Sequence, residues 1–164
     1  MSDLETTLLL RDLLQLLRSR KLTMGFAESC TGGLLSATVT ALPGVSDVFM
    51  GSIVSYSNAA KMAVLGVEES ALKKEGAVSE IVALQMAQGT RKQLKVEVSV
   101  AITGIAGPTG GTPTKPVGTV CFAVSGPGVA ESTIRKQFTG ERNEIQLASV
   151  RFAFEFLISR LRNS

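Results

Sequence analysis

The sequence contains no histidine among its 164 residues. This absence excludes a Ser-His-Asp triad, a Cys-His dyad and every metal site that needs an imidazole ligand. Any general base must therefore be a lysine, tyrosine, aspartate, glutamate or cysteine side chain. The acidic residues form neither a paired-carboxylate site nor a metal site along the chain, so we expect no metal and no other cofactor.

Cysteine is also scarce, because Cys30 and Cys121 are the only two and they fall in no CxxC or metal-ligand spacing. This favours a reducing compartment over a disulfide framework. The segment Ser2–Glu5 is too polar to begin a signal peptide. No apolar run reaches the ~20 residues that a membrane span requires. We therefore expect a cytoplasmic protein with no membrane partner.

The chain lacks a strong charge of either sign, has no tryptophan and has a single tyrosine, Tyr56. Its net charge is +3 and its basic residues are scattered. A nucleic-acid surface needs a basic stripe or an aromatic platform, so we expect no nucleic-acid partner. The length of 164 residues and the 45% hydrophobic content predict one globular domain over residues 1–164.

What the sequence does contain is a regular alternation of helical and extended segments. Amphipathic spacing and caps predict helices at 3–20, 34–42, about 58–66, 68–75, 79–94 and 141–162. Apolar and β-branched runs predict strands at 23–27, 48–56, 96–102, 117–124 and 129–138. This alternation predicts an α/β protein with a mostly parallel sheet covered by helices on both faces. The hairpin around 125–128 makes the sheet mixed.

The first candidate site is the turn Glu28–Gly33, which joins a strand to a helix. Ser29 would lie at the carboxyl edge of the sheet, where open α/β sheets bind ligands. The start of the next helix would suit a phosphate or the oxyanion of acyl transfer. An ordinary helix cap explains the same pattern equally well. Cys30 could replace Ser29 as nucleophile, but a small buried residue is the better interpretation of it.

The second candidate is the segment Tyr56–Lys61, in which Tyr56 closes a strand and Lys61 falls in the first turn of a helix. The helix dipole disfavours a cation there, which would help to lower the pKa of the lysine. For Lys61 to be half neutral at pH 7, its pKa must be lowered by an amount equivalent to about 4–5 kcal/mol. The helix dipole accounts for ~1 kcal/mol of this. Burial would have to supply the rest. A solvated surface lysine is the simpler interpretation of this segment alone.

The third candidate is the glycine-rich loop 103–112, which follows a strongly strand-like run. Such loops form backbone nests that bind anions, although the Walker pattern GxxxxGK[ST] is absent. A long loop inside a compact domain is more often functional than a mere connection. Arg142, near the start of the last helix, could hold a phosphate or a carboxylate with two hydrogen bonds. A solvated arginine at a helix start is the alternative.

Without histidine, a serine nucleophile needs a base of the lysine type. The residues therefore suggest Ser29 with Lys61, assisted by Tyr56, and leave open whether the two loops meet. A non-catalytic nucleotide- or sugar-phosphate-binding module is the alternative function. We reject a short-chain dehydrogenase, because Tyr56 and Lys61 lack the YxxxK spacing and no GxGxxG follows the first strand.

Five blocks of the sequence resemble the CinA C-terminal-domain family, whose stand-alone members include nicotinamide mononucleotide amidases. The blocks are AESCTGG (27–33), LPGVSDVFMGSIVSYSNAAKMAVLGV (42–67), GAVSE (76–80), AITGIAGPTGGTPTKPVGTV (101–120) and FTGERNEI (138–145). They cover nearly the whole chain after the first helix. The resemblance implies a three-layer α/β/α sandwich with a mixed, mostly parallel sheet, and a homo-oligomer.

The resemblance also implies an amidohydrolase that converts nicotinamide mononucleotide to nicotinate mononucleotide and ammonia, a step of pyridine nucleotide salvage. Ser29 would be the nucleophile of a Ser-Lys acyl-enzyme mechanism, Lys61 its partner and Tyr56 an assisting residue. Backbone N–H groups around 30–32 would hold the oxyanion. The residues expected to bind the small-molecule nucleotide are Cys30, Thr31, Gly32, Gly33, Thr103, Gly104, Ala106, Gly107 and Arg142.

Overall fold

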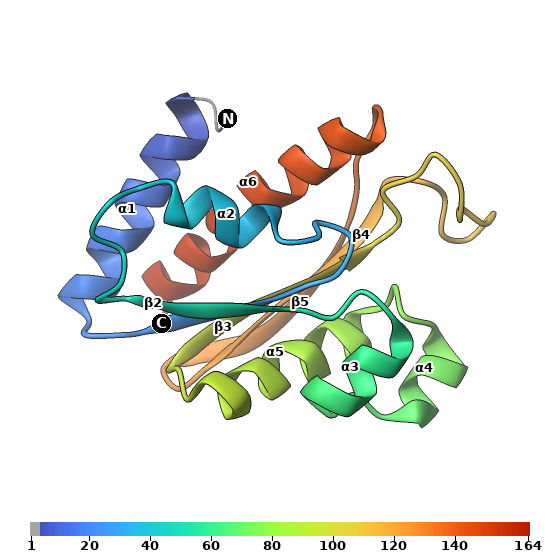
Figure 1. Ribbon diagram of the computed structural model, residues 1–164, viewed down its shortest axis with the longest axis horizontal. Helices are drawn as coiled ribbons and strands as arrows, with labels where there is room; N and C mark the ends of the chain where they lie inside the picture. Colours follow the sequence, from blue (N-terminus) through green and yellow to red (C-terminus); the bar gives the residue numbers. More distant parts are fainter. Residues whose placement is uncertain (1–3) are drawn as a thin grey trace.

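The computed structural model describes residues 4–164 and contains one five-stranded sheet in the order β2-β1-β3-β4-β5 (Figure 1). The strands are β1 (Met24–Glu28), β2 (Phe49–Val54), β3 (Val98–Gly104), β4 (Thr119–Gly126) and β5 (Val129–Gln137). The helices are α1 (Leu4–Ser19), α2 (Leu34–Thr40), α3 (Asn58–Leu65), α4 (Glu69–Glu75), α5 (Glu80–Leu94) and α6 (Arg142–Arg162).

Every helix and strand expected from the sequence is present, with small differences at the ends. Residue 2, expected in a polar stretch, and residue 3, expected at the start of the first helix, lie outside the described residues. Strand β2 ends at Val54, so Tyr56 lies beyond the strand and does not close it. Strand β4 begins only at Thr119, after a turn in which the N–H of Thr119 donates to the carbonyl of Pro116 at 3.0 Å.

The sheet is mixed, as the sequence predicts. Strand β1 pairs in parallel with β2 and β3, whereas β4 runs antiparallel to both β3 and β5. Among these five strands, β4 alone therefore runs against the common direction. Because β1, β2 and β3 are parallel, their carboxyl ends meet at one edge of the sheet. The candidate site lies at that edge.

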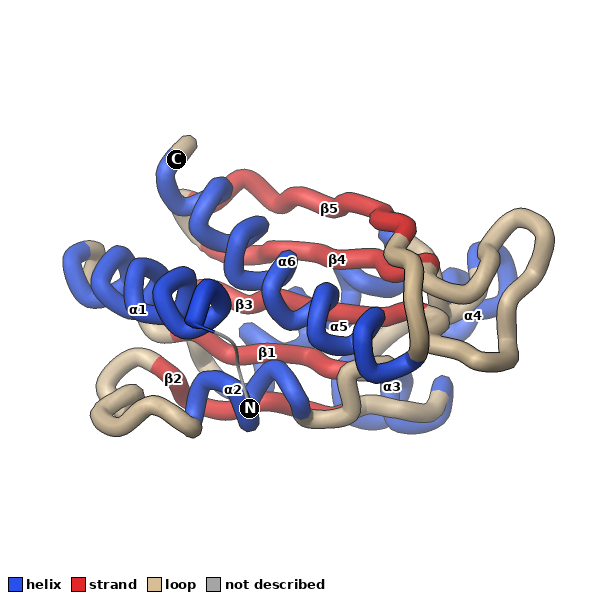
Figure 2. Tube along the Cα trace, turned by 90° about the horizontal axis from the view of Figure 1, so that it is seen from above, coloured by secondary structure: helices blue, strands red, loops and turns tan. Residues whose placement is uncertain are grey.

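Helices cover both faces of the sheet, which confirms the three-layer α/β/α fold. Helices α1, α2 and α6 lie on one face and α3, α4 and α5 on the other (Figure 1). Figure 2 looks onto the first of these layers, with the strands behind α1, α2 and α6.

Successive side chains along a strand point to opposite faces of the sheet, so the core has two parts, one on each face. On β3, Val100 and Ile102 belong to the larger cluster beneath α1 and α6, while Ala101 points into the smaller cluster beneath α5. Ala27 and Ala123 of the neighbouring strands join Ala101 there. Short side chains on this face let α5 pack close to the sheet. Helix α5 in turn supports α3, the helix that carries the candidate lysine.

Candidate active site

Ser29 immediately follows β1, and its backbone is fixed to the neighbouring strand. The N–H of Ser29 donates to the carbonyl of Ile102 on β3 at 3.0 Å. The residue is buried, yet it lines the cavity at this edge of the sheet. The hydroxyl is therefore rigidly mounted at a place that a small molecule can reach.

Glu28, the residue before Ser29, is fully buried and organises the turn that follows it. Its carboxylate accepts five hydrogen bonds of 2.9–3.0 Å, from Thr31 Oγ1, Gly33 N and Leu35 N at Oε2 and from Ser36 N and Ser52 Oγ at Oε1. Three of these donors are backbone N–H groups at the start of α2. The sequence left open whether this helix start binds an anion or is an ordinary cap; in the structure the side chain of Glu28 occupies it.

The oxyanion donors expected around residues 30–32 are therefore fewer than the sequence suggested. The N–H of Gly32 donates to the carbonyl of Ser29 at 3.0 Å, so it is not free to bind a ligand. The N–H groups of Cys30 and Thr31 donate to no backbone carbonyl within residues 4–164. These two groups are the remaining backbone donors of the turn next to the Ser29 hydroxyl.

Lys61 reaches Ser29 from helix α3, which begins after the cap residue Ser57. The Nζ atom of Lys61 lies 2.8 Å from Ser29 Oγ and donates to the carbonyl of Ser55 at 2.7 Å. A longer contact of 3.4 Å joins Nζ to the carbonyl of Tyr56. Lys61 is only 1% exposed, so the interpretation of this residue as a solvated surface lysine is wrong. The loops that carry Ser29 and Lys61 do meet.

Burial lowers the pKa of Lys61 to about 8, because the charged ammonium loses its hydration. Desolvation is the main cause, as the sequence argument expected when it assigned most of the required shift to burial. A neutral amine can donate two N–H groups to the two carbonyls and direct its lone pair at the Ser29 hydroxyl. This arrangement suits a lysine that takes the proton of a serine nucleophile.

Tyr56 stands at the mouth of the site and is not hydrogen-bonded to the serine–lysine pair through its hydroxyl. Its side chain is 62% exposed, and its hydroxyl accepts a hydrogen bond from Arg142 Nη2 at 3.1 Å. Arg142 also donates from Nη1 to the carbonyl of Gly107 at 2.7 Å. The direct contact between Lys61 and Ser29 therefore does not pass through the hydroxyl of Tyr56. Arg142 instead links Tyr56 to the loop that contains Gly107.

A cavity of about 330 Å³ contains most of the residues expected at the site. Nine of the expected residues line it, namely Ser29, Cys30, Tyr56, Lys61, Thr103, Gly104, Ala106, Gly107 and Arg142. Its volume lies in the range of small-molecule sites. The cavity thus brings together segments that follow β1, β2 and β3 and the first residue of α6.

Three residues expected to bind substrate do not line this cavity: Thr31, Gly32 and Gly33. The hydroxyl of Thr31 is committed to Glu28, as described above. Thr103 does line the cavity, but its hydroxyl donates to the carbonyl of Ala77 at 2.9 Å and is buried. Thr103 and Thr31 therefore stabilise the walls of the site.

Cys30 has the properties of a buried core residue, the interpretation that its sequence context favoured. Burial raises the pKa of its thiol to about 12, which disfavours the thiolate that a nucleophilic cysteine needs. Its carbonyl accepts a hydrogen bond from Gln146 Nε2 of helix α6 at 2.9 Å. Cys121 on β4 is also buried, and burial raises the pKa of its thiol to about 11.

Several residues of the site were not identified from the sequence. Ala77 and Val78 line the cavity and Gln146 supports it, and all three lie outside the candidate segments. Asn58, Ile105, Thr109 and Gly110 line the cavity and Glu28 supports it; these residues lie inside the candidate segments but were not singled out individually. An acidic residue just before a helix start fits the preference of helix N-termini for negative charge, so Glu28 carried a usable signal. The apolar wall residues carried none, because only the tertiary fold brings them to the cavity.

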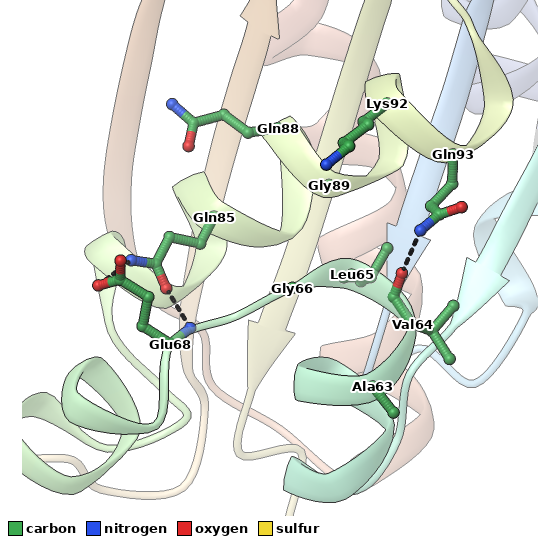
Figure 3. A pocket seen from close by; sticks show the side chains of 10 residues that line it. All are labelled: Ala63, Val64, Leu65, Gly66, Glu68, Gln85, Gln88, Gly89, Lys92 and Gln93. Carbon is green, nitrogen blue, oxygen red and sulfur yellow. Dashed lines mark hydrogen bonds between the residues drawn. The ribbon is translucent and has the colours of Figure 1, made fainter.

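A second cavity, of about 370 Å³, lies between α3 and α5 (Figure 3). Glutamine side chains span it: Gln85 accepts from the N–H of Glu68 at 3.0 Å, and Gln93 donates to the carbonyl of Val64 at 2.9 Å. Its lining includes Lys92 but no serine, cysteine or tyrosine. This groove therefore lacks the pairing of nucleophile and base found at the first cavity.

The same groove explains how α3 is held against α5. Gly89 of α5 faces the end of α3, where an added Cβ atom would lie 2.0 Å from the carbonyl oxygen of Leu65. Only glycine allows this approach, although glycine costs ~1 kcal/mol in a helix relative to alanine. The close packing fixes the helix that places Lys61 beside Ser29.

Comparison with known proteins assigns the chain to a family. Residues 7–161 match the model of the CinA C-terminal domain. The chain belongs to the CinA C-terminal domain family. It is 49% identical over 148 residues to a CinA-like protein of Thermotoga neapolitana, across 90% of this chain and 36% of that protein. A CinA-like protein of Prochlorococcus marinus is 50% identical over 138 residues, across 84% of this chain and 32% of that protein. This CinA-family chain thus spans about a third of the length of the curated relatives it matches.

Solved structures of the CinA superfamily have the same fold. The competence/damage inducible protein CihA of Agrobacterium tumefaciens superposes with a TM-score of 0.94 at 38% identity, across 99% of this chain and 98% of that one. A CinA superfamily protein of Klebsiella pneumoniae superposes with a TM-score of 0.92 at 34% identity, across 97% and 99%. These matches establish the family and the fold of the chain.

None of the helices within residues 4–164 combines the length and the apolar character needed to cross a lipid bilayer. In the same part of the chain, no three carboxylate or cysteine side chains gather closely enough to hold a metal ion. The functional groups that line the cavity include a serine hydroxyl, a lysine amine, a tyrosine hydroxyl and an arginine guanidinium.

Proposed function

We propose that this CinA-family protein is an amidohydrolase that releases ammonia from the carboxamide of nicotinamide mononucleotide. The observation that carries the proposal is the 2.8 Å contact between Lys61 Nζ and Ser29 Oγ, with the lysine buried and its pKa lowered to about 8. A buried amine next to a serine hydroxyl, at the wall of a cavity, is the arrangement that serine–lysine acyl transfer requires. The choice of substrate rests on the family resemblance.

In the first half of the reaction, neutral Lys61 takes the proton of Ser29, and Ser29 Oγ attacks the carboxamide carbon. The N–H of Cys30, the one residue of the turn 30–32 that lines the cavity, is the candidate to bind the oxyanion that forms. Lys61 then gives the proton to the departing nitrogen. The carbon–nitrogen bond breaks, ammonia leaves, and Ser29 carries the acyl group as an ester.

In the second half, a water molecule attacks the ester while Lys61 accepts one of its protons. The carbon–oxygen bond to Ser29 breaks, the proton returns to Ser29 Oγ, and the carboxylic acid product leaves. The net reaction adds water to the amide and gives acid and ammonia, so Lys61 ends in the state in which it began. The direct Lys61–Ser29 contact lets one amine serve both halves.

The cavity also supplies groups for a nucleotide phosphate. Arg142 is exposed at its wall, and the loop 104–110 contributes glycine backbone to the same wall. We assign the phosphate to Arg142 and this loop rather than to the start of α2, because the carboxylate of Glu28 fills the start of α2. A phosphate here would accept charge-assisted hydrogen bonds.

The proposal is tested by measuring ammonia released from nicotinamide mononucleotide by the parent protein and by Ser29→Ala. Release by the parent, with a loss of at least ~10³-fold in the variant, supports an amidase with this nucleophile. A folded parent that binds the nucleotide without releasing ammonia would instead be a binding module. In that case the affinity would not change in Ser29→Ala.

A further inference from the structure

We propose that Glu28 is a positioning residue that holds Ser29 at the distance from Lys61 needed for proton transfer. The inference rests on the proposed role of Ser29 as a nucleophile, but not on the identity of the substrate. Glu28 itself does not line the cavity, so it would act through the turn and not on the substrate. Its contribution follows from where its hydrogen bonds go.

The carboxylate of Glu28 ties together three parts of the chain. Oε2 accepts from Thr31 and Gly33, which lie in the turn, and from the first turn of α2. Oε1 accepts from the N–H of Ser36 and from the hydroxyl of Ser52 on β2. A carboxylate has about four lone-pair directions, so these five donors saturate it. The turn after Ser29 is thereby clamped to the helix on one side and to an adjacent strand on the other.

The backbone of Glu28 also links the two reacting residues. Its carbonyl accepts the N–H of Ser55 at 2.8 Å, and the carbonyl of Ser55 accepts Lys61 Nζ at 2.7 Å. Ser29 is the next residue in the chain. Glu28 thus contacts the support of the lysine through its main chain and the support of the serine through its side chain.

The side-chain bonds also decide which N–H groups remain for a ligand. Glu28 uses the N–H groups of Gly33, Leu35 and Ser36, and the carbonyl of Ser29 uses that of Gly32. Without the carboxylate, the N–H groups at the start of α2 would attract any nearby anion, including the phosphate of a misplaced substrate. Glu28 therefore both fixes the turn and keeps the anion site away from it.

Glu28→Gln tests the side chain with almost no change of shape. The amide places an NH₂ group where an oxygen accepted N–H donors, so at least one backbone N–H at the start of α2 loses its acceptor. Displacements of about 1 Å at a reacting group can cost ~100-fold in rate. We expect kcat to fall by ~10–100-fold, with KM changed less than about twofold, because the residues that line the cavity are unchanged.

The control is Glu97→Gln. Glu97 precedes β3 at the opposite end of the sheet and accepts from both the N–H and the hydroxyl of Thr23. It is a half-buried carboxylate that also accepts two hydrogen bonds, and it does not line the cavity. Ser52→Ala is a milder variant of the proposed clamp, since it removes only one donor to Oε1. It stays informative if Glu28→Gln does not fold.

The experiment compares kcat, KM, melting temperature and the rate at which a fluorophosphonate probe labels Ser29 in the parent and the three variants. We expect labelling and kcat to fall together in Glu28→Gln, less in Ser52→Ala, and not in Glu97→Gln. Equal rates in Glu28→Gln and the parent, or equal losses in Glu97→Gln, would overturn the inference. If Ser29 of the parent is labelled by the probe but the parent releases no ammonia, the proposed amidase activity is refuted. The labelling rates of the variants then still test the positioning role of Glu28. A parent that does neither would refute both.

Discussion

Lys61 Nζ lies 2.8 Å from Ser29 Oγ, although 32 positions separate the two residues in the chain. The contact exists because β1 and β2 are parallel neighbours, so the segments that follow them leave the sheet at the same edge. Ser29 follows the first strand directly, and Lys61 comes from the helix after the second. The absence of histidine makes this amine the base that the site can offer.

Replacing Lys61 by arginine keeps a positive charge but removes the base. The guanidinium stays protonated at all relevant pH values, so it cannot take the proton of Ser29. We expect Lys61→Arg to lower kcat for ammonia release by ~10²–10⁴-fold. Lys92→Arg, on the exposed side of α5, is the matched control and should retain parental turnover. Substantial activity in Lys61→Arg would rule out a lysine base.

The lowered pKa of Lys61 also predicts how stability depends on pH. The ordinary value is 10.5 and burial lowers it to about 8, so between these values the unfolded chain binds more protons than the folded one. The free energy of unfolding of the parent should therefore rise with pH across this window. Below it, the folded protein bears the full cost of burying the charge.

This effect is separated from other pH effects by comparing the parent with Lys61→Met. We expect the parent to gain ~2–3 kcal/mol relative to the variant between pH 7 and pH 10, measured by urea unfolding. The hydrogen bonds and packing that the methionine cannot reproduce are missing at both pH values, so their effect cancels in this difference. A difference that stays constant with pH would mean that Lys61 titrates normally.

Tyr56→Phe removes the hydroxyl that accepts from Arg142 and leaves the Lys61–Ser29 contact intact. We expect kcat to fall less than about fivefold, because the hydroxyl is outside the proton-transfer pair, while KM rises because Arg142 loses a partner at the entrance. Steady-state kinetics at saturating substrate separates the two parameters. A drop in kcat as large as that of Lys61→Arg would restore Tyr56 as a proton relay.

Cys30→Ala should retain catalysis. The thiol is buried and its pKa is raised to about 12, so it is not the nucleophile. We expect a modest loss of stability of ~1 kcal/mol from the small void and a kcat within about threefold of the parent. Thermal unfolding and ammonia release measure the two effects. Complete inactivation with normal folding would make the cysteine the reacting group.

Much of this architecture was predictable from sequence because it depends on local patterns. Hydrophobic periodicity and turn residues located the helices and strands, and the lack of histidine led to the pairing of Ser29 with Lys61. The orientation of side chains was not predictable in the same way. The hydroxyl of Tyr56 turns to Arg142, whose position depends on the packing of α6, far away in sequence.

Burial was the other property that local sequence could not supply. Lys61 was best interpreted as a surface residue from its own segment, and only the packing of α3 near the edge of the sheet makes it buried. Likewise, the start of α2 resembled an anion site because its N–H groups were counted without Glu28. In both cases the segment alone left the decision open or favoured the wrong alternative, because the elements that pack against it were not known.

The most direct test of the serine–lysine pair is the pH dependence of kcat/KM for ammonia release from nicotinamide mononucleotide, with Ser29→Ala as the background. Because kcat/KM reports the titration of the free enzyme, it should rise about tenfold per pH unit below the pKa of Lys61 and level off above it. That pKa is lowered to about 8. A rise that levels off near this value is the predicted result. A profile that is flat from about pH 6.5 to 9, or release that persists in Ser29→Ala, would contradict the account.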